Sequence, residues 1–451
     1  MSPTSNQSSC CAVRFAHRTT GSNVKIRPNQ HEIIGTSGAI MGSGQNSRQL
    51  MNSQPILRSI CPRNLLSFGP DTAPIELRNL NILIGANGSG KSNLIEIIAL
   101  LDNATRDLTV PIREGGGIGE WLWKDGRGSS KKAGTSTIGS VDVMVSPAHG
   151  DIPTEYFLAI GKSGFNVDVV EERLQSQKGF GKHPSPYLYF EKKGGRAVIN
   201  VNPGKKPRQL QIDDIDPRQS VLSQRKDPIQ YPELTYTGKQ FGRFAFYRDW
   251  TFGINAEARE VYALGQQSDY LEEDASNLAL VLNGLLSDPQ TKRRLLESLR
   301  LFYAPVTDIT TPIKEGSVEL RIEENNKIST PASRLSDGTL RWLSLLAVLL
   351  NPLPPPLTCI EEPELGLHPD VIPELGKLLK EAASRTQLIV TTHSHSLIEC
   401  FNDEPEDVCV CEKPDGATII RRLETAVLSE WLKQYSLGQL WAKGEIGGNR
   451  W

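Results

Sequence analysis

Short apolar segments alternate with polar turns and helical repeats along most of the chain, beginning near residue 54. Short apolar runs indicate buried strands, whereas apolar residues spaced three and four positions apart indicate helices. The pattern predicts strands within residues 55–68 and 75–84, then a glycine-rich turn, and then a helix over 93–101. The beginning of the patterned chain therefore has the order strand, loop, helix.

The middle of the chain has a different pattern. Five short apolar segments, separated by Gly, Pro and Lys turns, predict an antiparallel meander at residues 141–145, 156–160, 166–170, 187–190 and 198–201. Helical spacing follows at 276–286 and 289–301, without the sustained heptads of a long coiled coil. We therefore expect residues 103–316 to form an inserted antiparallel β and helical lobe.

The last third of the chain alternates regularly between strands and helices. Strands are predicted at 318–323, 357–360, 387–391 and 408–411, and helices begin at Asp337, Asp370 and His395. Such alternation is typical of parallel, doubly wound packing. The predicted fold class is α/β, with a mixed or parallel core sheet built from residues 51–102 and 317–451. Residues 1–50 lack this patterning, and we expect them to be disordered or to be an N-terminal extension, with Met41 and Met51 as alternative starts.

Composition narrows the class of protein. The chain has 451 residues, with 50 Lys and Arg against 52 Asp and Glu, so any nucleic-acid surface must be a local patch. The longest apolar stretch, residues 342–350, is far shorter than the ~20 residues that a membrane span needs. No secretory signal is evident, and the seven cysteines form no CxxC pair. We expect a cytoplasmic protein without disulfides, a zinc site or a membrane partner.

A phosphate-binding loop is the clearest chemical motif. The motif GxxxxGK[ST] is matched, between a predicted strand and a predicted helix, by Gly85, Ala86, Asn87, Gly88, Ser89, Gly90, Lys91 and Ser92. Glycines let the backbone N–H groups surround phosphates, and the helix N-terminus adds positive potential. We expect Lys91 to reach the β- and γ-phosphates of a nucleotide and the Ser92 hydroxyl to ligate Mg²⁺.

Adjacent acids follow the predicted strand at 357–360. Open α/β sheets bind ligands at the carboxyl ends of their strands, and two neighbouring carboxylates there call for a cation. We expect Glu361 to lie near Mg²⁺, directly or through water, and Glu362 to orient or deprotonate the attacking water. An acidic surface turn is the alternative interpretation of this pair.

Two further motifs complete a resemblance to a known family. Ser336 and Gly338 lie at the start of a strongly apolar helix before the acidic pair, and His393 follows the next apolar strand. In this order the motifs resemble those of ABC-type ATPase heads, in the branch that includes SMC and RecF proteins and OLD-like, AAA-type bacterial ATPases. On their own, Ser336 would be a helix cap and His393 a hydrogen-bonded structural residue.

The resemblance implies a P-loop NTPase head that works in head-to-tail pairs. ATP would be held by Lys91 of one copy and by Ser336 and Gly338 of the other, with Glu362 as the catalytic base and His393 as a γ-phosphate sensor. Glu361 stands where the family usually has Asp. The glutamine of the Q-loop is not found, because the chain between Asp102 and Val141 gives no strand that ends in Gln.

The sequence signals for macromolecular partners are less specific than those for the nucleotide. Residues 176–208 hold eight basic residues and one acid, with interleaved aromatics, which would suit either DNA contacts or the rim of a solvated hairpin. The chain after His393 is too short for the nuclease domain of the OLD-like relatives, so a nuclease or effector would be a separate protein.

The predicted function is an ATP-hydrolysing ABC/SMC-like ATPase that forms a homodimer, or a higher even oligomer, on Mg-ATP. It would control DNA binding or a partner effector, in DNA repair or phage defence. The alternatives are an ATP-dependent scaffold or switch with little turnover and, with less support, a transporter ATPase subunit, whose phosphate loop and signature loop are closer in sequence.

Overall fold

A computed structural model describes residues 54–124, 137–147, 150–164, 166–179, 184–200, 208–210, 214–265, 269–325 and 327–448. These residues belong to one compact unit that starts at Met51. The expected extension at residues 1–50, and parts of the basic stretch at 176–208, lie outside the described residues. No helix in the described ranges is long and apolar enough to cross a membrane.

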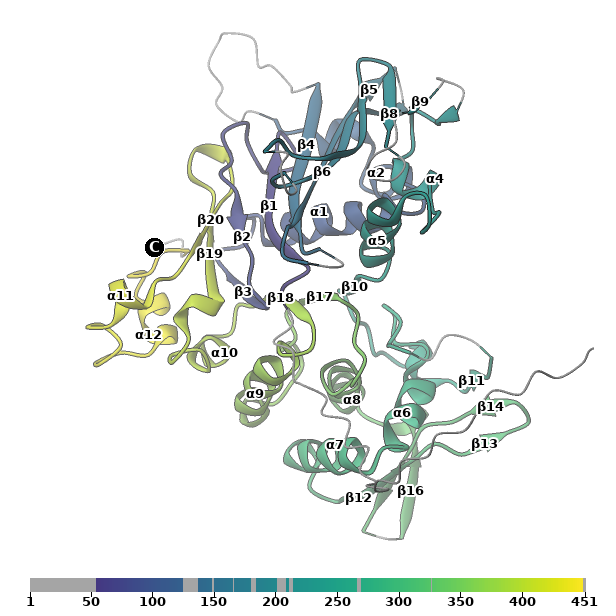
Figure 1. Ribbon diagram of the computed structural model, residues 1–451. Helices are drawn as coiled ribbons and strands as arrows, with labels where there is room; N and C mark the ends of the chain where they lie inside the picture. The colour runs from purple at the N-terminus through teal and green to yellow at the C-terminus, as the bar shows by residue number, and fades with distance from the viewer. Residues whose placement is uncertain are drawn as a thin grey trace, which may run out of the picture. The chain divides into compact units, whose positions relative to one another are not determined.

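A six-stranded sheet carries the phosphate loop (Figure 1). Its order is β10 (Ala245–Tyr247), β17 (Leu357–Glu361), β18 (Gln387–Thr391), β3 (Leu80–Ile84), β19 (Val408–Glu412) and β20 (Ile419–Arg422). The first five strands are parallel, and β20 pairs with β19 in the antiparallel sense. Glu361 pairs with Thr391, and Thr391 pairs with Leu83, so the carboxyl ends of three neighbouring strands lie level.

An antiparallel sheet of eight strands lies beside the helix that follows the phosphate loop (Figure 1). In spatial order its strands are β2 (Ile75–Glu76), β1 (Leu57–Arg63), β4 (Ile138–Val145), β5 (Thr154–Ser163), β6 (Asn166–Ser176), β7 (Leu188–Lys193), β8 (Arg196–Ile199) and β9 (Arg208–Leu210). The predicted meander is confirmed, because β4 to β8 pair in sequence order. Its strands alternate buried and exposed residues, as a sheet with one covered face requires.

Two small antiparallel sheets are formed by strands that lie before and after α6 (Leu278–Leu286) and α7 (Pro289–Phe302) in the sequence. One has the order β11 (Tyr262–Ala263), β14 (Ser317–Val318) and β13 (Ile313–Lys314), and the other has β12 (Val306–Thr310), β15 (Arg321–Glu324) and β16 (Ile328–Pro331). The α-helices within the described ranges are α1 (Lys91–Asn103), α2 (Thr109–Glu114), α3 (Ile118–Trp121), α4 (Val221–Gln224), α5 (Pro232–Phe241), α6 (Leu278–Leu286), α7 (Pro289–Phe302), α8 (Asp337–Leu349), α9 (Ile372–Ala382), α10 (His395–Glu399), α11 (Thr425–Leu428) and α12 (Leu437–Ala442).

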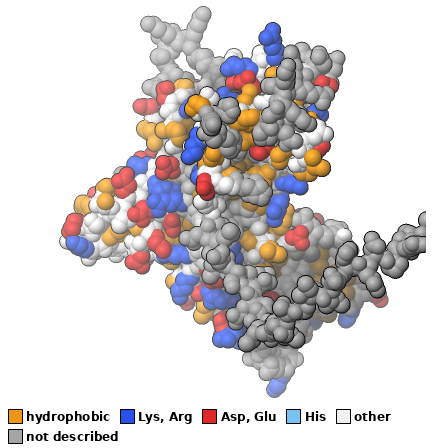
Figure 2. All heavy atoms as spheres, viewed as in Figure 1, with side chains coloured by type: hydrophobic (Ala, Val, Ile, Leu, Met, Phe, Trp, Pro, Cys, Tyr) orange, Lys and Arg blue, Asp and Glu red, His pale blue; other side chains and the backbone are white. Residues whose placement is uncertain are grey.

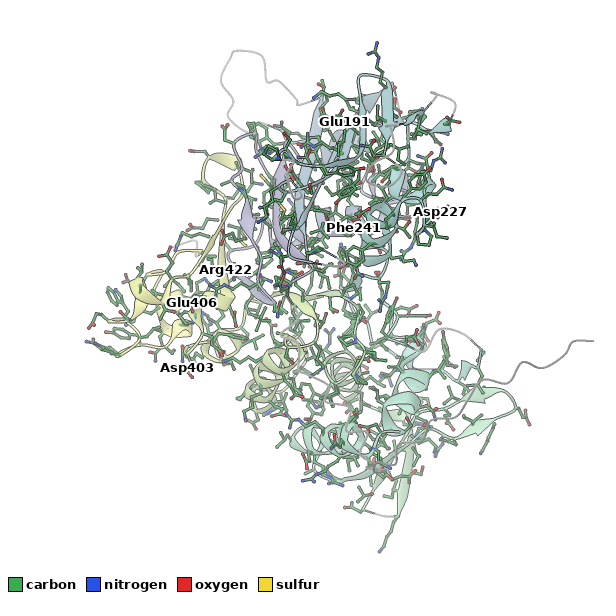
Figure 3. The ribbon with its side chains drawn as sticks, in the orientation of Figure 1. Glu191, Asp227, Phe241, Asp403, Glu406 and Arg422 are labelled. Carbon is green, nitrogen blue, oxygen red and sulfur yellow. The ribbon has the colours of Figure 1, made fainter. Side chains whose placement is uncertain are left out.

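Two hydrophobic cores cover opposite faces of the parallel sheet. Leu83, Cys359 and Ile389 face a core that includes the apolar side of α1, the inner face of the antiparallel sheet and α5. Phe241 of α5, labelled in Figure 3, is fully buried there, with its ring edge-on to that of Tyr156 at 5.6 Å. Ile82 and its neighbours face the second core, formed with α6 to α10 and α12. Because successive strand residues point to opposite faces, a strand covered on both sides is apolar throughout, as β3 is nearly so.

The predicted α/β fold class is confirmed, but two predicted strands divide. The segment 75–84 forms β2 and β3, which lie in different sheets. The buried side chain of Asn81 explains the division, because it bonds to both backbone groups of Arg78 where the chain turns. The segment 318–323 likewise separates into β14 and β15, which belong to the two small sheets.

Strand pairing also crosses the predicted domain limits. β1 and β2, from the predicted core, extend the antiparallel sheet, whereas β10, from the predicted lobe, is an edge strand of the parallel sheet. The limit at residue 316 falls between β13 and β14, which pair with each other. The division at 51–102, 103–316 and 317–451 remains a prediction about domains, but it does not follow the sheets. The cysteines in the described ranges are free, and Cys359, Cys409 and Cys411 are buried in strands.

Candidate nucleotide site

The phosphate loop joins the end of β3 to the start of α1. Gly90 lies directly before the helix with φ 102°, a left-handed conformation that glycine adopts without steric cost. A Cβ atom at this position would lie only 2.2 Å from Thr418 Oγ1 and 2.7 Å from Ser67 Oγ. Thr418 also donates to the carbonyl of Ser89 at 2.9 Å. The back of the loop is therefore held by side chains that follow β1 and precede β20, in a space that only glycine fits.

Lys91 is the central cation of the loop. It is 7% exposed, and its Nζ donates to the carbonyl oxygens of Gly85 at 2.8 Å and Ala86 at 3.2 Å. Burial lowers the pKa of its ammonium group, while the nearby carboxylates of Glu361 and Glu362 oppose that shift. A buried ammonium beside backbone N–H groups at a helix N-terminus is suited to binding phosphate oxygens.

Glu361 is the last residue of β17 and lies beside the phosphate loop. Its Oε2 accepts a hydrogen bond from Ser92 Oγ at 3.0 Å, and its Oε1 lies 3.9 Å from Arg248 Nε. Burial raises the pKa of this carboxyl group, and the Ser92 bond and Arg248 partly offset that rise. Two oxygen donors this close fit Mg²⁺, which is held in many NTPases by one or two protein oxygens together with phosphates and water.

Glu362 and His393 lie at the ends of neighbouring strands. The His393 Nε2 is 3.7 Å from Glu362 Oε1, and both side chains are about one-third exposed. Glu362 has φ 44°, so its backbone leaves the extended conformation directly after β17, and its N–H donates to the Thr391 carbonyl at 3.0 Å. Burial, followed by the charge of Lys91, lowers the pKa of His393, so its imidazole is neutral at neutral pH.

Glu364 fixes the loop that carries His393. Its Oε1 accepts hydrogen bonds from the Thr392 hydroxyl at 2.6 Å and from the backbone N–H of His393 at 3.0 Å. The sequence pattern did not single out this role of Glu364. The S/T-rich end of β18, directly before a histidine, was the only signal of it.

A strand that the sequence pattern did not reveal completes this edge of the sheet. The Q-loop segment was expected between Asp102 and Val141, but the strand beside β17 is β10, at residues 245–247. The residue after it is Arg248, whose guanidinium lies 5.2 Å from the centre of the Phe246 ring and near Glu361. An arginine from outside the segment expected for the Q-loop thus stands beside Glu361.

The serine and glycine of the predicted signature loop lie at the start of α8. Ser336 is exposed and caps the helix, with its Oγ accepting from the Thr339 N–H at 3.1 Å. Gly338 packs against the loop after Glu364, since a Cβ here would lie 3.0 Å from the carbonyl oxygen of Gly366. Within the described residues no hydrogen bond joins Ser336 to the phosphate loop of the same chain.

A cavity of about 530 Å³ opens beside the tip of the phosphate loop, whose residues 86–89 line one side of it. The end of β19 and Gly448 line the other side. The Gly448 N–H donates to Glu412 Oε1 at 3.0 Å, and a Cβ on Gly448 would lie 3.3 Å from the Gly85 Cα. The segment after α12 thus contacts the phosphate loop, although residues 449–451 lie outside the described ranges.

The described part of the basic stretch has partners for two of its lysines and buries two of its aromatic rings. Lys193 pairs with Glu171 at 3.1 Å, and Lys192 is half-buried and donates to the Pro217 carbonyl. Tyr189 and Phe190 are buried in the meander rather than displayed for stacking. Glu191 lies on the same strand (Figure 3), and basic and acidic side chains are intermixed on the face shown in Figure 2. The described part of this stretch fits a hairpin rim better than a DNA platform.

Comparisons with known proteins agree with this geometry. Residues 80–399 match the family model described as "AAA domain, putative AbiEii toxin, Type IV TA system". A search of curated proteins finds no significant match. Among solved structures, an SMC head bound to the C-winged helix domain of ScpA is 14% identical with a TM-score of 0.50, and the alignment covers 83% of this chain and 99% of that one.

Two other SMC heads give lower scores. The head from Thermotoga maritima is 14% identical with a TM-score of 0.41, covering 82% of this chain and 99% of that chain. The head from Pyrococcus furiosus, bound to the C-terminal domain of ScpA, is 12% identical with a TM-score of 0.47, covering 84% and 99%. At these identities the likeness concerns the fold. The matched family model spans most of the chain, so the protein belongs to the AAA family of putative AbiEii type, with the ABC-like fold of an SMC head.

Proposed function

We propose that this protein binds and hydrolyses ATP with Mg²⁺, and that two copies pair head to tail around the nucleotide. The observation that carries the proposal is the meeting of five side chains at one edge of the sheet. Lys91 and Ser92 begin α1, Glu361 accepts from Ser92 at 3.0 Å, and Glu362 lies 3.7 Å from His393. These are the groups that phosphoryl transfer to water needs: cations for phosphate, oxygens for a metal and a carboxylate for water.

Each residue has one task in this proposal. Lys91 binds the β- and γ-phosphates in place of the loop carbonyls that its ammonium contacts in the structure. Ser92 and Glu361 are the residues that would hold Mg²⁺, which when bound neutralises charge on the phosphates. Glu362 accepts the proton of the attacking water, and neutral His393 donates a hydrogen bond to the γ-phosphate.

Pairing of heads is supported by the exposed signature loop. Ser336 and Asp337 are exposed, and Ser336 caps a helix of thirteen residues whose N-terminus carries positive potential. The second copy would bring Ser336 and Gly338 to the phosphates bound by Lys91. Leu365, 52% exposed on the loop beside Gly338, would lie at the same interface.

The downstream role is the control of a separate effector protein, in phage defence or DNA repair. The description of the matched family names a putative AbiEii toxin of a toxin–antitoxin system. The SMC head of similar fold was solved with a bound protein partner. DNA binding is a weaker proposal, because Lys193 pairs with an acid, Lys192 donates to a backbone carbonyl, and the aromatic rings of Tyr189 and Phe190 are buried. A scaffold that holds ATP with little turnover is the alternative, and the next experiment separates the two.

Glu362→Gln tests the proposal. The amide cannot accept the proton of water, so we expect ATP turnover to fall by about 100-fold or more. ATP binding should survive, and the variant should form a stable dimer with Mg-ATP that wild type forms only transiently. Light scattering after size exclusion measures the dimer, and phosphate release measures turnover.

The control combines Glu362→Gln with Lys91→Ala, which should abolish both nucleotide binding and the dimer. A wild-type protein that neither binds nor hydrolyses ATP, with or without DNA, would contradict the proposal. A wild type that already forms a stable ATP-bound dimer with negligible turnover would favour the scaffold.

A further inference from the structure

Arg259 is a buried charged residue directly beneath the signature loop. It ends a short 3-10 helix at residues 257–259, and its side chain is only 7% exposed. Burying a guanidinium is costly unless its N–H groups are bonded. The side chain of Arg259 meets this requirement within the chain.

The guanidinium joins two segments that are distant in sequence. On one side it donates to the carbonyl oxygens of Phe252, at 3.1 and 2.8 Å, and Gly253, at 2.9 Å. On the other side it donates to the carbonyls of Ala332 at 3.2 Å and Leu335 at 2.7 Å. It also forms a charge-assisted hydrogen bond with the carboxylate of Asp337. The bonded residues Leu335 and Asp337 flank Ser336 directly.

A second arginine holds the same two segments together. Arg341, one turn into α8, donates to the Trp250 carbonyl at 2.7 Å, and its guanidinium lies 5.6 Å from the centre of the Phe252 ring. The segment of residues 248–259 thus begins at Arg248, beside Glu361, and ends at Arg259, beneath Ser336. It leads from the chain's own acidic pair to its signature loop.

We infer that Arg259 is the positioning residue of the signature loop and acts on the ATP bound by the other copy. This inference rests on the proposed head-to-tail pair. A planar guanidinium with five N–H donors holds the Leu335 carbonyl before Ser336 and the Asp337 carboxylate after it, which sets the direction of the Ser336 hydroxyl and the Gly338 backbone. The N–H groups of the Arg259 side chain bond to groups of its own chain on both segments, so its effect on turnover is transmitted through the loop.

The inference predicts a defect that appears only in the partner's site. Arg259→Met should lower turnover at saturating ATP by about 100-fold, since small misplacements of binding groups cost that much. The phosphate loop of the same copy is untouched, so binding of a fluorescent ATP analogue to the isolated copy should be unchanged. Lys91→Ala should instead lose nucleotide binding.

Mixing the two inactive variants is the decisive experiment. In a dimer of one Lys91→Ala copy and one Arg259→Met copy, one site has an intact phosphate loop and an intact signature loop. Each mixed dimer has one intact site of two, so the mixture should regain turnover that neither variant shows alone, up to about half of the wild-type turnover per dimer. Mixing Lys91→Ala with Ser336→Arg is the positive control. Arg259 is intact in both of these variants, so the mixture tests head-to-tail pairing alone.

The outcomes separate the inference from the proposed function. If the Ser336 pair regains turnover and the Arg259 pair does not, the inference is wrong. If neither pair regains turnover while wild type is active, head-to-tail pairing is wrong. Equal loss of nucleotide binding in Arg259→Met and Lys91→Ala would also overturn the inference.

Milder variants guard against misfolding. Asp337→Asn removes only the charge at the 67%-exposed partner, and Arg259→Lys keeps the charge but cannot bond to all four carbonyls. Both should fold, lose turnover by a smaller factor and regain it with Lys91→Ala. Arg243→Met, an exposed arginine after α5 without a side-chain partner among the described residues, is the matched control and should keep wild-type turnover. Full turnover in both milder variants would count against the inference.

Discussion

The phosphate loop has no room for a Cβ atom at Gly90. Its φ of 102° and the closeness of Thr418, which lies 2.2 Å from where a Cβ would be, both exclude a side chain. Gly88 also has a positive φ, of 79°, but a Cβ there would meet no atom within 4 Å. A side chain at Gly88 would therefore meet backbone strain alone, whereas a side chain at Gly90 would meet backbone strain and steric overlap.

We predict that Gly90→Ala is much more destabilising than Gly88→Ala. Gly88→Ala should cost only the ~1 kcal/mol of a left-handed non-glycine residue, whereas Gly90→Ala must also displace Thr418. Thr418→Ala in the Gly90→Ala background should recover part of the loss. Chemical denaturation measures the free energies of unfolding, and equal losses in the two single variants would contradict the steric argument.

Residues with a motif were predictable, and residues without one were not. The phosphate loop has a fixed spacing, and Glu361, Glu362 and His393 each follow an apolar strand, so their places at one sheet edge follow from parallel pairing. Arg248 follows a strand of three residues and Arg259 ends a 3-10 helix of three residues, and elements this short show no period of apolar residues. Their contacts are set by tertiary packing between segments far apart in sequence.

At the scale of elements, α1 carries an acid at its unfavourable end. Asp102 lies in the last turn, where the helix dipole disfavours a negative charge, and its Oδ1 is buried without a hydrogen-bond partner. Its Oδ2 bonds to Arg106 at 2.8 Å. Burial raises the pKa of the Asp102 carboxyl to about 6, in spite of that arginine.

This shift predicts a stability that falls as the pH rises. In the unfolded chain the Asp102 carboxyl has a pKa of ~3.9, whereas in the folded protein its pKa is about 6. Between these two pH values the folded protein binds the proton more tightly than the unfolded chain does, so the free energy of unfolding falls as the pH rises. Above about pH 6 the carboxyl is ionised in both states and this loss is complete. Asp102→Asn should therefore raise the free energy of unfolding by about 1–3 kcal/mol at pH 8 and change it little near pH 4.

Denaturation at several pH values measures this difference. Asp107→Asn is the control of opposite sign, because hydrogen bonds from Gln219 and Thr109 lower the pKa of Asp107. That variant should lose stability at pH 8. A gain in Asp102→Asn that is the same at all pH values would refute the electrostatic explanation.

The elements that local pattern determines were predicted well. The meander and the helices at Asp337 and His395 have clear periods or caps, and both are confirmed. The divisions at residues 77–79 and 319–320 were not predicted, because a continuous apolar run does not show where a chain leaves one sheet for another. β10 has only three residues, too few to show a period.

At the scale of the whole described chain, the two large sheets exchange strands. β1 and β2 belong to the antiparallel sheet and are followed at once by β3 of the parallel sheet, while β10 returns from the lobe to the parallel sheet. One hydrophobic core contains residues of both sheets and of α1. The antiparallel sheet therefore has no core separate from the parallel sheet and α1.

We therefore predict that residues 103–316 do not fold as a separate fragment. Without β1, the strand β4 would expose an unpaired edge and the core would lose α1. The whole protein should unfold in a single step, with tryptophan fluorescence and circular dichroism coinciding. Dispersed NMR spectra from the isolated fragment would contradict this prediction and restore the lobe as a domain.

The contact of Gly448 with the phosphate loop has a practical consequence. A stretch of chain more than three hundred residues downstream of Gly85 forms one wall of the cavity at the loop tip. A small fluorophore attached close to Gly448 would change its fluorescence when a nucleotide binds, without any change to the residues that bind it. A bulky fusion at the same place would compete with the nucleotide for space, so purification tags are better placed elsewhere.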